Sequence, residues 1–138
     1  AGLLHDIGMI GIPEEILNKP GNLSDEEYDV IKKHVEYGVK ILEDIKQFET
    51  VLKIIRHHHE RFDGTGYPKG LKGKEIPLLT RVLTLAESYD AMIYPLDHKK
   101  PMTQEEAISE IKKNSGTQFD PEIADIFIKM LHEKMQVE

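Results

Sequence analysis

The spacing of apolar residues constrains this sequence most, because it follows the three-to-four-residue period of α-helices along most of the chain. No stretch shows the clean alternation of apolar and polar residues that is typical of a half-buried β-strand. Two capping boxes of the form Ser/Thr-x-x-Glu, Ser24 with Glu27 and Thr103 with Glu106, predict helix starts. The sequence therefore predicts an all-α fold, a globular helical bundle.

Helix boundaries follow from these signals and from glycine and proline. The first residues, 1–8, resemble the end of a helix already under way, because apolar residues begin at once with no capping residue ahead of them. Residues 63–77 contain four glycines and two prolines, which predicts a loop. Asp120 followed by Pro121 predicts a helix start. The expected helices span about residues 24–45, 48–62, 80–93, 103–116 and from 120 onwards.

Composition limits the class of protein. With 138 residues and 39% hydrophobic content, residues 1–138 are expected to form a single domain, which the opening residues suggest is incomplete at its N-terminus. No apolar run approaches the roughly 20 residues of a membrane span, so we expect a cytoplasmic protein without a membrane segment. The net charge of −7 argues against polymeric nucleic acid as a partner.

Three consecutive histidines, His57 to His59, lie in the second expected helix of a chain that has 7 histidines in total. At about 100° per residue, His58 lies on the apolar face of that helix and His59 at its edge. His57 falls on the opposite side beside Lys53 and is predicted to be a surface residue. His34 lies on the apolar face of the preceding helix. Adjacent inward imidazoles are costly to bury, so they are expected to have a partner.

A metal ion suits these residue types. The sequence contains 0 cysteines, so any metal must be held by histidines and carboxylates. Neutral imidazole nitrogens, together with a carboxylate able to bridge two cations, suit Fe, Mn or Zn chemistry. Two alternatives remain open, namely a packed core histidine at position 34 and a polar helix end at positions 58 and 59. The candidate ligands are His5, Asp6, His34, His58 and His59.

The ordered motifs resemble one family over nearly the whole chain. "HD" at positions 5–6, the later His34, "HHE" at 58–60 and "DGTGYP" at 63–68 are similar to the motif series of the HD-GYP family, a branch of the HD-domain metal phosphohydrolases. "HDIGMIGIPEEILNKPG" and "SGTQFDPEI" extend the similarity. The resemblance implies an all-α fold, a centre of two or three divalent metals, often iron or manganese, and hydrolysis of cyclic di-GMP to pGpG or onward to GMP.

The resemblance also implies roles for individual residues. His5 and Asp6 would form the catalytic pair, with Asp6 bridging two metals. His34, His58 and His59 would complete the shell of one metal, and His5 with Glu87 of "AESYDAM" that of the other. Asp90 is the alternative carboxylate. Residues near the site implied to contact substrate or partners are Gly64, Thr65, Gly66, Tyr67, Lys99 and Lys100.

Family members usually lie behind a sensor or receiver domain, and diguanylate cyclases of the GGDEF type are further possible partners.

Several positions depart from the family pattern. Met9 stands where the family has a phosphate-contacting lysine, Glu87 is one methylene longer than the usual aspartate, and Leu96 and His98 replace an arginine and a tyrosine. An upstream helix with further ligands is also absent from this sequence. These departures predict reduced activity; the alternatives are a degenerate domain that binds metal, messenger or partners, and a phosphohydrolase of another nucleotide.

Overall fold

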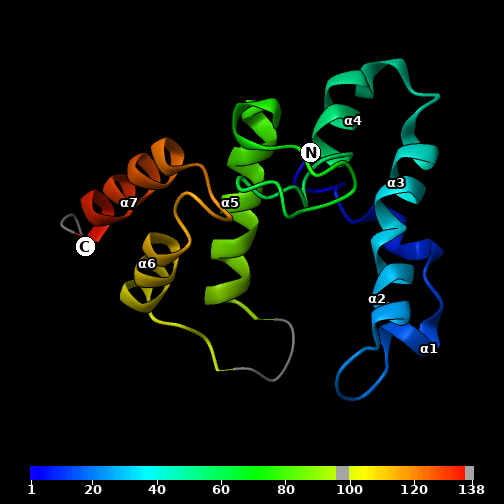
Figure 1. The fold of residues 1–138 in the computed structure, drawn as a ribbon, viewed down its shortest axis with the longest axis horizontal. Helices are drawn as coiled ribbons and strands as arrows, with labels where there is room; N and C mark the ends of the chain where they lie inside the picture. Colours follow the sequence, from blue (N-terminus) through cyan, green and yellow to red (C-terminus); the bar gives the residue numbers. More distant parts are fainter. Residues whose placement is uncertain (96–99, 136–138) are drawn as a thin grey trace.

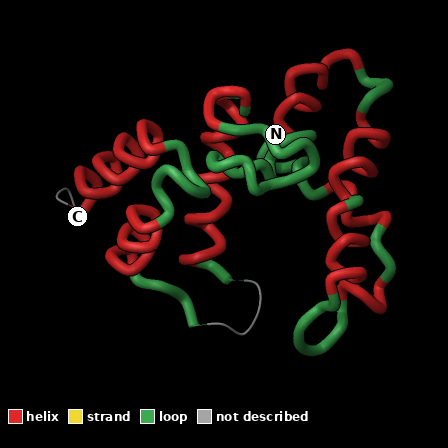
Figure 2. The backbone as a smooth tube through the Cα atoms, in the orientation of Figure 1, coloured by secondary structure: helices red, strands yellow, loops and turns green. Residues whose placement is uncertain are grey.

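The computed structural model describes residues 1–95 and 100–135, and these residues confirm the all-α prediction. Helices joined by loops make up the described ranges, which contain no β-strand and only an isolated bridge between Ser115 and Phe119 (Figure 2). None of the helices in these ranges is both long enough and apolar enough to cross a membrane.

The chain begins differently from the prediction. Residues 2–6 form turns, and a 3-10 helix, η1 (Ile7–Gly11), follows them in place of the expected end of an α-helix. A short helix, α1 (Glu14–Leu17), comes next. Leu3 is fully exposed, whereas Leu4 and Ile7 are partly buried against Val39, Leu42 and Ile55.

The helix expected over residues 24–45 is divided into α2 (Asp25–Lys32) and α3 (His34–Leu42). The predicted capping box at Ser24 is confirmed, because its hydroxyl accepts from Glu27 N while the Glu27 carboxylate accepts from Ser24 N. The division occurs at Lys33, whose N–H donates to Val30 O in a tight three-residue turn. Lys33 keeps right-handed dihedrals, φ −66° and ψ −15°, so the apolar spacing continues across the break and does not reveal it.

The next helix, α4 (Glu49–Ile55), follows a 3-10 turn, η2 (Lys46–Phe48), and ends well before the predicted position 62. After Ile55 the backbone tightens, with His57 N donating to Ile54 O and Glu60 N to His57 O. The carbonyl of Ile55 is bonded by the His58 ring, so a side chain replaces the helical backbone partner at this end. The predicted loop then follows and contains one short turn, η3 (Gly73–Glu75).

Three longer helices complete the fold: α5 (Leu78–Ile93), α6 (Gln104–Lys113) and α7 (Pro121–Met135). The capping box at Thr103 is confirmed, and Asp120 caps α7 by accepting from Glu122 N at 2.8 Å. Figure 1 shows α5 in the centre, with α6 and α7 on one side of it and α1 to α4 on the other. The α5–α7 side has its own buried core, formed by Leu85, Ile108, Ile111, Phe119, Ala124, Ile128 and Leu131.

A second core lies between α3 and α4 and contains Val39, Leu42 and Ile55. η1 packs against α3 so closely that a Cβ on Gly8 would lie 1.9 Å from the carbonyl oxygen of His34. This contact between backbones sets the two residues before η1, His5 and Asp6, beside the start of α3. On the other side, the Thr84 hydroxyl of α5 donates to His58 O at 2.8 Å. Three segments that are distant in sequence therefore meet at one place.

Candidate metal centre

Four predicted ligands, Asp6, His34, His58 and His59, form one cluster. His34 Nε2 lies 3.3 Å from His58 Nε2 and 3.2 Å from His59 Nε2. The Oδ1 atom of Asp6 is 3.5 Å from His34 Nε2 and 3.8 Å from His58 Nε2. All four ligand atoms lie within 4.8 Å of one another, a separation that one metal ion can span.

Backbone carbonyls orient the two buried rings of this cluster. His34 Nδ1 lies 2.7 Å from Ile31 O, and His58 Nδ1 lies 2.6 Å from Ile55 O. A carbonyl only accepts, so each ring must carry its proton on Nδ1, and each neutral ring then presents a lone pair at Nε2. Lone pairs 3.3 Å apart in a buried site repel each other unless a cation lies between them. The chemistry of the donor set thus fits a bound metal.

His5, Asp6 and Glu87 form a second cluster. His5 Nε2 is 3.1 Å from Asp6 Oδ2 and 3.5 Å from Glu87 Oε1, while its Nδ1 lies 2.7 Å from Gly2 O. Asp6 therefore directs one oxygen to each cluster, the arrangement expected of a carboxylate that bridges two cations. Glu87 reaches the site from α5 despite its extra methylene. Asp90, the alternative carboxylate, is exposed and belongs to neither cluster.

The histidine pKa values shift in opposite directions in the two clusters. Hydrogen bonds to Asp6 and Glu87 raise the pKa of His5 to about 10, and the His5 and His58 rings hold the pKa of the Asp6 carboxyl well below its usual range. Burial, followed by the neighbouring His58 and His34 rings, lowers the pKa of His59 to about 3. Burial also lowers the pKa of His34. His34 and His59 of the first cluster are therefore neutral at pH 7, as metal binding requires.

The glycine-rich loop is fastened to this centre by Glu60, a residue that sequence reasoning missed. The Glu60 side chain is fully buried and accepts from Lys69 N at 2.7 Å and Leu71 N at 3.0 Å. Tyr67 in this loop stacks on His59, with ring centroids 4.8 Å apart and planes 24° apart. The signal in the sequence was its place in the motif "HHE" at 58–60, directly after the two inward histidines, but this position did not reveal its contacts with the loop.

Gly64, Thr65 and Gly66 each have a different structural role in the loop. A Cβ on Gly66 would lie 2.4 Å from Arg61 N, so only glycine permits this close approach. Gly64 turns the chain at φ +86°. Thr65 donates both its N–H and its hydroxyl to Asp63 Oδ1, at 2.9 and 2.6 Å. Lys100 is exposed, and Lys99, Leu96 and His98 lie outside the described residues.

The prediction for His57 is wrong in part. This residue belongs to neither ligand cluster, as expected, but its side chain is only 16% exposed and its Nδ1 lies 3.6 Å from Glu60 Oε1. The early end of α4 is the reason, because residues 56–59 form turns and do not continue the helical face on which the projection relied.

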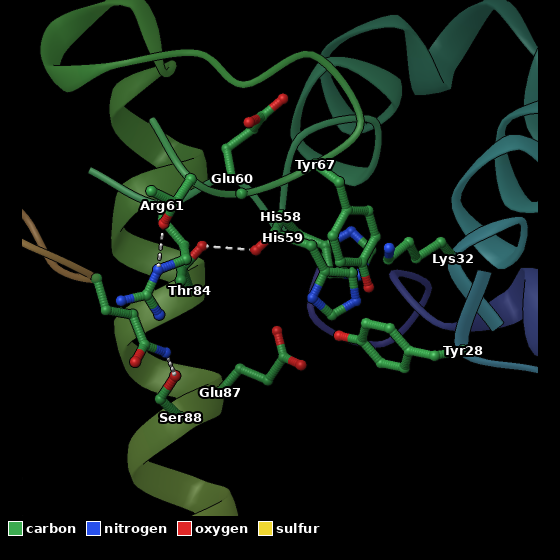
Figure 3. Close-up of a pocket in the computed structure, with 13 residues that line it drawn as sticks. Tyr28, Lys32, His58, His59, Glu60, Arg61, Tyr67, Thr84, Glu87 and Ser88 are labelled. Carbon is green, nitrogen blue, oxygen red and sulfur yellow. Dashed lines mark hydrogen bonds between the residues drawn. The ribbon is translucent and has the colours of Figure 1, made fainter. Parts of the chain in front are cut away.

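A cavity of about 320 Å³ opens beside the first cluster (Figure 3). Tyr28 and Lys32 of α2 lie on one side of it, and Glu87 points into it from α5. Sequence reasoning missed both α2 residues, although their four-residue spacing places them on one helix face. The predicted loop residues that line the cavity are Thr65, Gly66 and Tyr67.

Comparison with known proteins agrees with this geometry. Residues 1–123 match the profile of the family described as "HD domain". A cyclic di-GMP phosphodiesterase from Thermotoga maritima is 43% identical over 132 residues, covering 94% of this chain and 36% of the relative. A 3'3'-cGAMP-specific phosphodiesterase 2 from Vibrio cholerae is 37% identical over 131 residues, covering 94% of this chain and 25% of the relative.

The fold is also similar to a solved structure. The crystal structure of a cyclic GMP-AMP specific phosphodiesterase from Vibrio cholerae superimposes with a TM-score of 0.65 at 25% sequence identity, covering 95% of this chain and 36% of that one. This chain thus spans about a third of the length of such relatives. It belongs to the HD domain family, and its motifs are those of the HD-GYP branch.

Proposed function

We propose that the chain is a metal-dependent phosphodiesterase domain that hydrolyses cyclic di-GMP to pGpG, GMP or both. The observation that carries the proposal is the pair of ligand clusters that share Asp6 beside a cavity of about 320 Å³. The catalytic pair would be His5 and Asp6, and the metal ligands would be these two with His34, His58, His59 and Glu87. The similarity to a named cyclic di-GMP phosphodiesterase supports the choice of substrate.

The proposal includes two divalent cations, one in each cluster, with iron or manganese as the metal, because mixed imidazole and carboxylate ligands suit both. Such cations supply a nucleophile from water at neutral pH and offset the charge that develops on a phosphate. Asp6 would fix the distance between the two sites through its two oxygens. Ile31 O and Ile55 O would keep the Nε2 atoms of His34 and His58 directed at the metal.

The loop and α5 would hold the substrate against this centre. Tyr67 covers one face of His59 and borders the cavity, so it would limit access of bulk water to that ligand. Thr65 and Gly66 line the cavity and would contact the substrate. Lys100, which the resemblance also implies as a substrate contact, lines a different pocket with Pro101 and Met102. The proposal further includes action in the cytoplasm, under a sensor or receiver domain and with GGDEF-type partners, as the resemblance to the HD-GYP family implies.

Met9 favours a second candidate function. It lies in η1, where the family's lysine would contact the scissile phosphate, and a methionine there provides no charge. A domain that keeps metal and fold but binds a cyclic dinucleotide without cleaving it is therefore the alternative. A third candidate, hydrolysis of 3'3'-cGAMP, is favoured by the similarity to an enzyme named for that substrate.

Turnover assays separate these candidates. Protein loaded with Mn²⁺ or Fe²⁺ is incubated at high concentration with cyclic di-GMP and, separately, with 3'3'-cGAMP, and the products are separated by chromatography. Cleavage of cyclic di-GMP to pGpG or GMP is the expected result, and selective cleavage of 3'3'-cGAMP would favour the third candidate. If neither is cleaved, the enzyme proposal fails. Restoration of turnover by Met9→Lys would then identify the degenerate domain.

A further inference from the structure

Two residues of α2, Tyr28 and Lys32, form a group with Tyr67 at the edge of the cavity. The Lys32 Nζ atom lies 4.9 Å from the centroid of the Tyr28 ring and 5.7 Å from that of Tyr67. The two tyrosine rings are 6.5 Å apart and nearly perpendicular, at 84°. In Figure 3 Lys32 extends toward the stacked Tyr67 and His59 rings, and Tyr28 lies below it.

Packing of the protein core does not account for this group. α2 contains no buried residue, and Tyr28 is 47% exposed. The Tyr28 ring borders the cavity. Its exposed surface is therefore available to a ligand.

The charge of Lys32 is also available. Its partner, Asp29 Oδ1, lies 2.7 Å from Nζ, but both side chains are well exposed, at 35% and 68%, and such ion pairs contribute little. Of the described residues that line the cavity, the other cationic one is Arg61. Its Nε donates to Thr65 Oγ1 at 3.1 Å, and its guanidinium lies 3.7 Å from Asp63. The Arg61 side chain therefore stabilises the loop.

The group is continuous with the metal centre. Tyr67 contacts the α2 pair on one side and stacks on His59 on the other. A molecule whose phosphate lies at the two clusters can thus extend past Tyr67 toward Lys32 and Tyr28. A cyclic dinucleotide has a second phosphate and flat nucleobases, which are the groups that an ammonium and an aromatic ring recognise.

We propose that Tyr28 and Lys32 form a nucleotide-recognition subsite in which Lys32 contacts a phosphate and Tyr28 stacks on a base. The inference rests on the proposed binding of a cyclic dinucleotide. Lys32 provides positive charge on the α2 side of the cavity. Stacking accepts any base, so the subsite raises affinity for cyclic di-GMP and 3'3'-cGAMP to a similar extent.

Steady-state kinetics with cyclic di-GMP test the subsite, and Lys33 supplies a matched control because it is the adjacent, exposed lysine outside the cavity. Lys32→Met is expected to raise KM roughly tenfold, with Lys32→Arg closer to wild type. Tyr28→Leu is expected to raise KM to a similar extent, whereas Tyr28→Phe keeps the ring and the affinity. Metal content and thermal midpoint should be unchanged in all of these variants, since none of them removes a metal-binding side chain.

Equal effects of Lys32→Met and Lys33→Met, or unchanged KM in both Lys32→Met and Tyr28→Leu, would overturn the inference. Hydrolysis of bis(p-nitrophenyl) phosphate, a small diester without nucleobases, reports on the metal centre and should be nearly equal in wild type and the control Lys33→Met. If the wild type cleaves no dinucleotide, the enzyme proposal fails, and calorimetric binding of cyclic di-GMP to the metal-loaded variants replaces KM. Absence of binding to the wild type would then overturn the subsite as well.

Discussion

The Nε2 atoms of His34 and His58 lie 3.3 Å apart, although both rings carry their only proton on the opposite nitrogen. Two neutral acceptors at this distance form no hydrogen bond with each other, and both residues are buried. Their repulsion is relieved by a cation that accepts both lone pairs. The arrangement therefore favours metal binding by the folded chain.

Removal of metal should lower the stability of the folded protein. A ligand that binds only the native state, present at a free concentration of about 100 times its Kd, adds about 2.7 kcal/mol to the free energy of unfolding. Dialysis against EDTA should accordingly lower the thermal midpoint, and readdition of Mn²⁺ should restore it. Calorimetry of His34→Ala provides the control, because this variant should no longer respond to either treatment. A midpoint that is the same with and without metal would contradict the prediction.

Single substitutions in the histidine triplet should affect metal content unequally. His58→Ala and His59→Ala each remove a member of the first cluster, whereas His57 lies outside it. Elemental analysis is expected to show loss of metal from the first two variants and retention in His57→Ala. Equal loss from all three would show that the cluster is not the metal site.

Glu87 and Asp90 provide a similar comparison on α5. Glu87 Oε1 lies 3.5 Å from His5 Nε2, and Asp90 is exposed and outside both clusters. Glu87→Gln should reduce the bound metal from about two ions per chain to about one, since only the second cluster loses a charged ligand. Asp90→Asn should leave the stoichiometry unchanged. Elemental analysis and metal titration measure both.

Glu60 should matter for stability without being a metal ligand. Glu60→Ala leaves the partly buried N–H groups of Lys69 and Leu71 without their acceptor, and an unsatisfied group costs at most about 1–3 kcal/mol when it is shielded from water. Denaturant unfolding should show this loss, with Glu60→Gln less affected because its amide oxygen can still accept. The exposed Glu36→Gln is the control and should change the free energy of unfolding by less than about 0.5 kcal/mol. A Glu60→Ala variant as stable as wild type would refute the role.

Asp63 should give the loop a small pH dependence. Hydrogen bonds from Thr65 hold the pKa of the Asp63 carboxyl below its usual value of 3.8. A lowered pKa in the folded state adds stability that is present above the unfolded pKa and is lost as the pH falls through the folded pKa. Thr65→Val removes the hydroxyl donor. Its free energy of unfolding should therefore be lower than that of wild type at neutral pH, and the two values should converge in strong acid. Thermal midpoints measured between pH 7 and pH 2 test this.

The parts of the fold and site that depend on local chemistry could be predicted from sequence. Both capping boxes start helices, and the inward position of His34 follows from apolar spacing, whereas His58 and His59 turn inward from positions beyond the end of α4. The break at Lys33 and the early end of α4 could not be predicted, because the former keeps helical dihedrals and the latter depends on a side chain bonding Ile55 O. Glu60, Tyr28 and Lys32 acquire their places through tertiary contacts with the loop, which no periodicity encodes.

The contact of Gly8 with α3 has a consequence for evolution and design. Main-chain atoms of η1 and α3 meet at Gly8. The distance between Asp6, just before η1, and His34, on α3, is therefore set by the backbones and not by side-chain packing, which could adjust. A single methyl group at position 8 would separate the two halves of the centre, so variation at this one position is far more restricted than at the neighbouring Met9.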